Sequence, residues 1–300
     1  MKKKLNFVKI AILLPLVFLS SCDYELDDED YVFDWSNIEE PEKEEDKRPV
    51  WLLKHRCNSN VGLEKSDVEV ALEGGCNGVE VDIRYRKSDD SLVLSHDRLF
   101  LNKRETVEDF LSLDVLKDEG MNLIVFDIKE PEQISNLIDV VHDFEIENNF
   151  YKINYVYSVA KLKDAVAYFP AIASKLENNE GVCVDFHPNA YEVEALYQSA
   201  GIKNCWYGDG IFFGSEAFGI KDGCCDAVSI RDAETGDSSI KKVENWTVQF
   251  AQDFYERLVY WKVDCLLLDS PLASKVNTLM NGARNIRIAN RNDSPFENKK

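Results

Sequence analysis

The sequence predicts a single α/β domain, a closed (β/α)₈ barrel, and three observations lead to this prediction. From Val50 onward, short apolar runs alternate with stretches of helical period, the pattern of repeated βα units. Eight such units over about 240 residues have the size and rhythm of a (β/α)₈ barrel. The alternative is an open doubly wound sheet, but no glycine-rich phosphate loop follows the first predicted strand. In the barrel, chemistry is expected at the carboxyl ends of the strands.

The composition fits one large folded domain and argues against a nucleic-acid-binding protein. The chain has 300 residues, a mass of 34.4 kDa and 45% hydrophobic residues, which is enough to bury a sizeable core. It carries 35 Lys and Arg against 55 Asp and Glu, a net charge of −20. Contacts with nucleic-acid phosphates need clustered cations, so no nucleic-acid partner is expected. Eight cysteines are too dilute for a disulfide scaffold.

Residues 1–21 are predicted to be a lipoprotein signal rather than part of the fold. Three lysines in Met1–Lys4 precede the apolar run Ile10–Leu19, which is too short to span a bilayer. Leu19–Cys22 then resembles the lipobox of bacterial lipoproteins, in which Cys22 would become the acylated N-terminus. An ordinary cleaved signal with an incidental cysteine is the alternative. Lipidation at Cys22 would anchor the protein in the bacterial cell envelope, at the outer membrane, facing the periplasm or the exterior.

Residues 22–48 are predicted to form an acidic tether between the lipidated cysteine and the barrel. Residues 23–46 include thirteen acidic residues and one lysine, so this stretch repels itself and is expected to stay solvated and extended. Acidic residues directly after the cysteine also resemble the surface-export signal of Bacteroidetes lipoproteins, although a plain charged linker would look the same. The barrel is expected over residues 49–290, and a polar tail over residues 291–300.

The strands and helices of the barrel are predicted one by one from this alternation. The predicted strands are Val50–His55, Gly78–Tyr85, Asn122–Asp127, Ile153–Ser158, Gly181–Asp185, Lys203–Trp206, Lys242–Val248 and Cys265–Asp269. The predicted helices are Leu63–Glu73, Thr106–Leu116, Glu132–Asn148, Ala160–Phe169, Tyr191–Ala200, Glu216–Lys221, Ala251–Tyr260 and Leu272–Met280. Ser66 can cap the first helix and Gly74-Gly75 can end it, whereas Pro131 can open the third.

Carboxylates at two strand ends predict a metal site. Along the second strand, Glu80 and Asp82 project to one face because side chains alternate. The third strand ends with Asp127. Acidic groups facing into a barrel repel one another and lose hydration, and a hard divalent cation with oxygen ligands is the simplest compensation. One divalent cation is therefore expected, Mg²⁺ in preference to Ca²⁺.

Histidines and cations at the same strand ends predict attack on a phosphodiester. The first strand ends in His55-Arg56, His96 follows a short extended run, and Lys129 follows the third strand. One imidazole can activate the attacking hydroxyl or water while the other protonates the leaving oxygen, since histidine titrates near neutrality. Lys129 and Arg56 can neutralise the remaining charge of the phosphate. Any one of these residues alone has an ordinary structural explanation, so the prediction rests on their joint appearance.

These residues also carry a resemblance to the glycerophosphodiester phosphodiesterases. That family's HRG…GADGVExDV…HD signature is similar to His55-Arg56, Gly75–Asp82 and Leu92–Asp97. Its WTVN strand and TDxP terminus are similar to Trp246–Gln249 and Leu268–Pro271. The resemblance spans Val50 to about Ala273 and implies the same barrel.

A second branch of that superfamily, the sphingomyelinase D or phospholipase D toxins, is similar in other features. His55-x-x-Asn58, Val125–Lys129 and Ser199–Ile202 followed by Gly208–Ile211 match that branch. Only 30 residues separate His96 from Asp127, which leaves no room for the small inserted domain of the glycerophosphodiesterases. Cys57 replaces the glycine of the first family, and Gln249 replaces a toxin-type aspartate.

The resemblance implies roles that agree with the physical interpretation. His55 and His96 would be the acid–base pair, and Glu80, Asp82 and Asp127 the metal ligands. Lys129 would contact the phosphate, and Asn58 and Trp246 would complete the substrate-binding residues beside Arg56.

The sequence therefore predicts a metal-dependent phosphodiesterase that acts on glycerophosphodiesters or on phospholipid head groups. Sphingomyelin or a lysophospholipid, cleaved with a cyclic phosphate product, is the alternative substrate. A different class of function is a catalytically inactive lipoprotein barrel that binds a head group or glycan, but all five expected acid–base and metal positions are filled. An unrelated sugar-binding barrel would leave the spacing of these residues unexplained. No obligate protein partner is expected.

Overall fold

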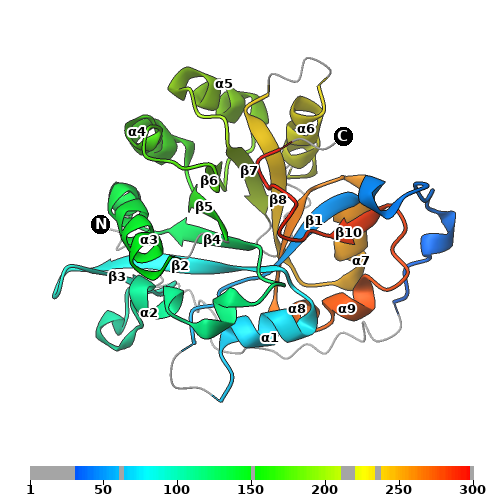
Figure 1. Ribbon diagram of the computed structural model, residues 1–300. Coiled ribbons are helices and arrows are strands. Elements are labelled where there is room, and N and C mark those ends of the chain that lie inside the picture. Colours follow the sequence, from blue (N-terminus) through cyan, green and yellow to red (C-terminus); the bar gives the residue numbers. More distant parts are fainter. Residues whose placement is uncertain (1–30, 61–63, 150–152, 211–219, 234–237, 298–300) are drawn as a thin grey trace, which may run out of the picture. The chain divides into compact units, whose positions relative to one another are not determined.

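Eight parallel strands close into a barrel in the computed structural model, which describes residues 31–60, 64–149, 153–210, 220–233 and 238–297 (Figure 1). The barrel strands are β1 (Arg48–Lys54), β2 (Gly78–Arg86), β4 (Leu123–Ile128), β5 (Asn154–Val159), β6 (Glu180–Val184), β7 (Cys205–Gly210), β8 (Ile240–Val248) and β9 (Cys265–Leu268). Strand β1 pairs with both β9 and β2, which closes the sheet. The predicted (β/α)₈ barrel is thus confirmed, and the open doubly wound sheet is excluded.

Two short strands extend the barrel sheet at its two ends. Strand β3 (Ser91–Leu94) pairs antiparallel with the last residues of β2. Strand β10 (Ile286–Ile288) pairs in parallel with the first residues of β1. The β2–β3 hairpin therefore projects from the carboxyl end of the barrel and returns the chain there.

Figure 1 shows the helices packed outside the strands. They are α1 (Asp67–Gly74), α2 (Val107–Leu111), α3 (Ile134–Asn148), α4 (Leu162–Ile172), α5 (Ala190–Ala200), α6 (Ile220–Arg231), α7 (Ala251–Tyr255), α8 (Ser270–Ala273) and α9 (Val276–Leu279). Ser66 caps α1 in a capping box, and Gly75 ends it with φ of +100°, as expected for a glycine C-cap.

Several helices differ in extent from the prediction. Helix α1 begins at Asp67 rather than Leu63, and α2 ends at Leu111 rather than Leu116. The sixth was expected over Glu216–Lys221, of which residues 216–219 lie outside the described residues, whereas the helix that is described begins at Ile220. Helix α7 continues as a π-helical turn over Glu256–Tyr260. The last predicted helix is divided into α8 and α9.

Side chains point alternately to the two faces of each strand, so the apolar ones form two separate cores. Inside the barrel, Trp51, Val125 and Trp206 belong to a small cluster. Outside it, a larger cluster that includes Val81 and Phe126 lies between the strands and the helices. Burial on both sides explains why the strands have long apolar runs.

The amino end of the barrel is covered by the end of the described chain. Trp206 donates its indole N–H to the carbonyl oxygen of Pro295 at 3.0 Å, and the Lys242 ammonium donates to that of Glu297 at 2.7 Å. Phe296 is 6% exposed and belongs to the inner cluster. These residues of the expected polar tail thus contact the barrel, and the opposite, carboxyl end is left for the functional side chains.

Residues 33–47 were expected to belong to a solvated, extended tether, but they pack against the barrel. The Trp35 ring is buried and lies 5.6 Å from that of Tyr255, and Phe33 stacks on the same tyrosine at 4.5 Å. Residues 32–300 form one compact unit that contains every barrel strand and both cores, which is what a domain needs to fold by itself. Residues 1–21 and Cys22 lie outside the described residues. No helix in the described part of the chain is long and apolar enough to cross a membrane.

Candidate active site at the carboxyl end of the barrel

Three carboxylates from neighbouring strands converge inside the barrel mouth. Glu80 and Asp82 alternate with outward-facing residues on β2, and the register pairs Asp82 with Asp127 on β4. One carboxylate oxygen from each of the three lies within 4.8 Å of the others. The structure therefore brings the predicted metal ligands together on the inner face of two adjacent strands.

Burial and neighbouring charges shift the pKa values of the Glu80 and Asp82 carboxyl groups in opposite directions. Burial, and then the charges of Asp82 and Asp127, raise the pKa of Glu80 well above its usual value. Burial also acts to raise the pKa of Asp82, but the Lys129 ammonium and the Asn58 amide outweigh it and the pKa lies below its usual value. Glu80 Oε1 and Asp127 Oδ1 are buried and have no hydrogen-bond partner among the described residues. Two ligand oxygens thus remain available.

The loop after β1 folds back over these carboxylates. Arg56 adopts a left-handed backbone with φ of +56°, and its N–H donates to Glu80 Oε2 at 2.7 Å. Asn58 forms two hydrogen bonds with Asp82: its amide donates to Oδ2 at 2.6 Å, and its Oδ1 accepts from the Asp82 N–H at 2.9 Å. The Arg56 Nε lies 4.0 Å from Asp82 Oδ2, and its side chain is 44% exposed. Its guanidinium can therefore reach a ligand in the mouth.

Lys129 places one fixed cation beside the acidic cluster. Its ammonium lies 2.6 Å from Asp82 Oδ1 and also pairs with Asp127. Three carboxylates and one ammonium carry a formal charge of −2, which one divalent cation would neutralise. The hard oxygen donors, their close approach and the two unpartnered oxygens fit a divalent ion of the Mg²⁺ or Ca²⁺ type.

His55 lies at one side of the carboxylates, held by two residues that belong to the family-like motifs Leu268–Pro271 and Trp246–Gln249 but had no predicted role. Its Nε2 is 3.8 Å from Glu80 Oε2, and its Nδ1 is 3.2 Å from Asp269 Oδ1. Gln249 donates to the other oxygen of Asp269 at 2.7 Å. Burial acts to raise the pKa of Asp269, but these two hydrogen bonds outweigh it and the pKa is lowered. Asp269 therefore fixes the imidazole with its Nε2 toward the mouth.

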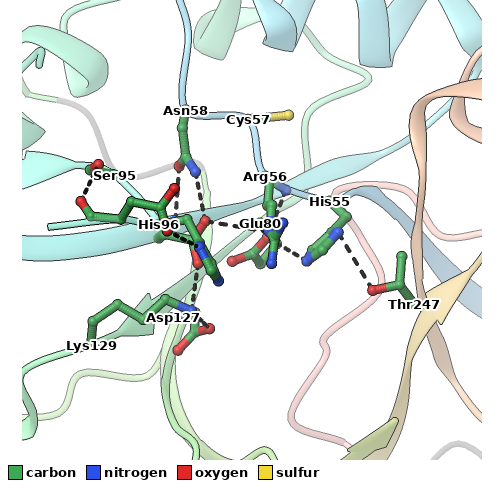
Figure 2. A network of polar contacts seen from close by, with 12 residues as sticks. His55, Arg56, Cys57, Asn58, Glu80, Ser95, His96, Asp127, Lys129 and Thr247 are labelled. Carbon is green, nitrogen blue, oxygen red and sulfur yellow. Dashed lines mark hydrogen bonds and ion pairs between the residues drawn. The ribbon is translucent and has the colours of Figure 1, made fainter. Parts of the chain in front are cut away.

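His96 reaches the site from the loop that follows β3. The Ser95 N–H donates to the Asp82 carbonyl oxygen at 2.8 Å, which holds this loop against β2. The His96 Nδ1 lies 3.0 Å from Asp97 Oδ1, and its imidazole is 40% exposed. Figure 2 shows the imidazoles of His55 and His96 on two sides of the acidic cluster. The two predicted acid–base groups thus face one site, His96 at its more open side.

Trp246 approaches the site along β8. Its indole donates to the Asp185 carbonyl oxygen at 2.9 Å, and the hydroxyl of the next residue, Thr247, lies 3.5 Å from His55 Nδ1. The Trp246 side chain can therefore form a wall of the mouth on the His55 side.

Two further acids of the barrel interior were not predicted. Burial, and then the charge of Glu244, raise the pKa of Asp185 well above its usual value. Burial raises the pKa of Glu244 to about 7. Both belong to predicted strands, Gly181–Asp185 and Lys242–Val248, but neither follows a recognisable motif. A protonated carboxyl at either position would limit the negative charge beneath the metal site.

A comparison with protein-family models identifies a matching family. A family model described as "Dermonecrotic toxin SPH" matches residues 45–296, which include every strand of the barrel. No curated protein matches the chain.

Proposed function

The chain belongs to the dermonecrotic toxin SPH family, the sphingomyelinase D branch of the phosphodiesterase barrels, and on this premise we propose that it cleaves sphingomyelin or a lysophospholipid at phosphorus. At the coarse level, it is a phospholipase D-type phosphodiesterase. The observation that supports the finer proposal is the convergence of two imidazoles, Lys129 and three carboxylates on one barrel mouth. Glycerophosphodiesters remain a second candidate substrate class, on the motif resemblance alone.

The acidic cluster is proposed to hold the one divalent cation. Glu80, Asp82 and Asp127 would be its ligands, and the ion would supply Lewis-acid polarisation of a nonbridging phosphoryl oxygen. Lys129 and Arg56 would neutralise further negative charge on the phosphoryl group, and Asn58 keeps Asp82 oriented.

His55 and His96 differ in hydrogen-bond partner and in exposure, and we assign their roles from this difference. His55 Nδ1 is paired with Asp269, so this imidazole can accept a proton at Nε2 and the resulting cation is stabilised by the carboxylate. We therefore assign to His55 the removal of the proton from the attacking hydroxyl or water. As the new oxygen–phosphorus bond forms and the bond to the head-group oxygen breaks, His96 at the open side donates a proton to that leaving oxygen.

The decisive experiment follows phosphorus directly. Residues 32–300 are incubated with sphingomyelin, lysophosphatidylcholine and glycerophosphocholine in parallel, and ³¹P NMR records the products. We expect a new phosphorus signal from the first two substrates, and its loss when a chelator is added. A cyclic phosphate indicates attack by the substrate's own hydroxyl. A signal from glycerophosphocholine alone would favour the second substrate class.

Histidine variants test the mechanism with a matched control. His55→Ala and His96→Ala are each expected to lower turnover by about 10²-fold or more, the usual contribution of an acid–base group. His142→Ala is the control, because that imidazole pairs with Glu180 at 2.9 Å, behind the barrel wall. Full activity in both site variants would contradict the mechanism. Binding of substrate with no product from the unaltered protein would favour the inactive, head-group-binding barrel.

We also propose that the mature protein is lipid-anchored through Cys22 in the bacterial envelope. The lipobox-like residues Leu19–Cys22 and the basic, apolar sequence before them support this proposal. Metabolic labelling with an alkyne fatty acid in a bacterial host tests it: label is expected on the full chain and should be lost in Cys22→Ser. Equal labelling of both would contradict it.

A further inference from the structure

We propose that the rim of the barrel mouth is a docking face for a zwitterionic lipid bilayer, formed by Leu99, Phe100, Phe186 and Phe250. We call these four side chains the apolar rim. This inference deepens the proposed function, because it states how the site meets a substrate that resides in a membrane.

The pair Leu99-Phe100 is the first support. The loop that carries it begins directly after His96, and the two side chains are 68% and 67% exposed. Phe100 adopts a left-handed backbone with φ of +59°, a conformation that bulky residues rarely adopt because their Cβ atom is crowded. The fold therefore accepts local strain while it presents two large apolar side chains to water. A partner that buries them would account for both features.

The loop is held in place rather than free. The Arg86 guanidinium donates to the carbonyl oxygens of Leu101 and Arg104 at 2.9 and 3.1 Å. The Lys103 ammonium lies 5.7 Å from the centre of the Phe100 ring. Because both ends of the loop are tied to the β2–β3 hairpin or to the site, the exposed pair is presented at a fixed place on the rim.

The remaining apolar side chains lie elsewhere around the same mouth. Phe186 follows the carboxyl end of β6, is 49% exposed and lies 6.0 Å from the Trp246 ring, centre to centre. Phe250 follows the carboxyl end of β8 and is 37% exposed. Since β2, β6 and β8 are separated in the strand order, the apolar side chains surround the site rather than lie at one edge.

The charge of the protein favours a zwitterionic bilayer over an anionic one. Arg98 and Lys103 accompany the apolar pair. Arg98 is 76% exposed and pairs with Glu130 at 3.3 Å, and the exposed Lys103 ammonium can bind a lipid phosphate. The chain as a whole carries a net charge of −20, so a strongly anionic bilayer would repel it. A zwitterionic phosphocholine surface offers phosphates without that repulsion. Insertion of apolar side chains, rather than net electrostatic attraction, would then supply most of the affinity.

Vesicle co-sedimentation tests the proposal with a double variant. Residues 32–300, unaltered or carrying Leu99→Ser with Phe100→Asn, are mixed with vesicles of sphingomyelin and phosphatidylcholine in the presence of a chelator, which prevents turnover. Asn tolerates the left-handed backbone, so the second substitution should not impair folding. We expect the partition coefficient to fall at least tenfold, because two large apolar side chains no longer enter the bilayer.

Ile146→Ser is the matched control, because Ile146 is also 68% exposed but lies near the end of α3, away from the mouth. We expect its vesicle binding to equal that of the unaltered protein. Equal binding of the rim variant and the unaltered protein would overturn the proposal, and so would an equal loss in the control. Binding only to anionic vesicles, or a dimer that the rim substitutions dissociate, would also overturn it.

The outcome is independent of the test of the proposed function. Vesicle binding is measured without turnover, whereas the ³¹P NMR experiment detects turnover on dispersed substrate. Binding without product would leave the docking face in place and remove the enzyme. Product without vesicle binding would support the proposed enzyme and overturn the docking face.

Discussion

Two buried acids at opposite ends of the barrel, Glu80 and Asp264, differ in how the fold treats their charge. Each is 2% exposed. Asp264, at the amino end, pairs with Arg231 and accepts the Val243 N–H at 2.8 Å, and the Arg48 guanidinium lies 3.8 Å away. Burial acts to raise the pKa of Asp264, but these cations outweigh it and the pKa is lowered. For Glu80, burial and two neighbouring carboxylates together raise the pKa.

The charges around Asp264 mark it as a structural acid, whereas those around Glu80 fit an acid that binds a cation. At the amino end, fixed cations compensate the carboxylate and contribute to folding. At the carboxyl end, acids outnumber cations and two oxygens have no partner among the described residues. The same burial thus has opposite consequences for Glu80 and Asp264, because only Asp264 has enough cations around it to lower its pKa.

The largest expected effect is on stability at the amino end. Asp264→Asn removes the buried carboxylate that faces Arg231 and Arg48, and we expect a loss of about 3–5 kcal/mol in the free energy of unfolding, measured with urea. The control is Asp232→Asn, because Asp232 pairs with the same arginine but its side chain is 53% exposed. The free energy of unfolding of Asp232→Asn should fall by less than about 1 kcal/mol. Equal losses in the two variants would break the comparison.

A third buried acid tests whether a raised pKa alone makes a metal site. Burial raises the pKa of Glu145, on α3, from its usual value of 4.5 to about 7. Between these values the folded state binds more protons than the unfolded state, so stability should fall as the pH rises from about 4.5 through 7. The fall should approach about 3 kcal/mol and disappear in Glu145→Gln, by thermal unfolding at several pH values. Mg²⁺ should raise the Tm of the unaltered protein and of Glu145→Gln equally, and a smaller rise in Glu145→Gln would weaken the distinction between the two kinds of buried acid.

A smaller effect is expected where Asp269 positions His55. Asp269→Asn keeps the shape but loses the charge that stabilises a protonated imidazole. We expect turnover to fall about tenfold, and the basic group in the pH profile of kcat/KM to titrate at lower pH. Gln249→Ala should reproduce the fall only in part. An unchanged pH profile would remove Asp269 from the mechanism.

The sequence predicted all eight strands, most of them because burial on both faces gives a long apolar run; in β7 and β8, glycine or charged residues interrupt that run. Helix limits were less predictable: Pro131 marks the turn before α3, but nothing in Leu272–Met280 indicates the break between α8 and α9. Glu80 and Asp82 were found because strand alternation is local. Asp269 is 214 residues from His55, and barrel closure through the β1–β9 pairing is what brings them together. No local pattern reveals that contact.

Calorimetry shows whether the mouth is built to hold a cation at a cost in stability. Residues 32–300 and Glu80→Gln are unfolded thermally in chelator and in Mg²⁺, with Ca²⁺ in parallel. The account predicts that the cation raises the Tm of the unaltered protein by several degrees. It also predicts that Glu80→Gln has the higher Tm in chelator and responds little to the cation. An unaltered protein indifferent to both ions, or a Glu80→Gln variant less stable in chelator, would contradict it.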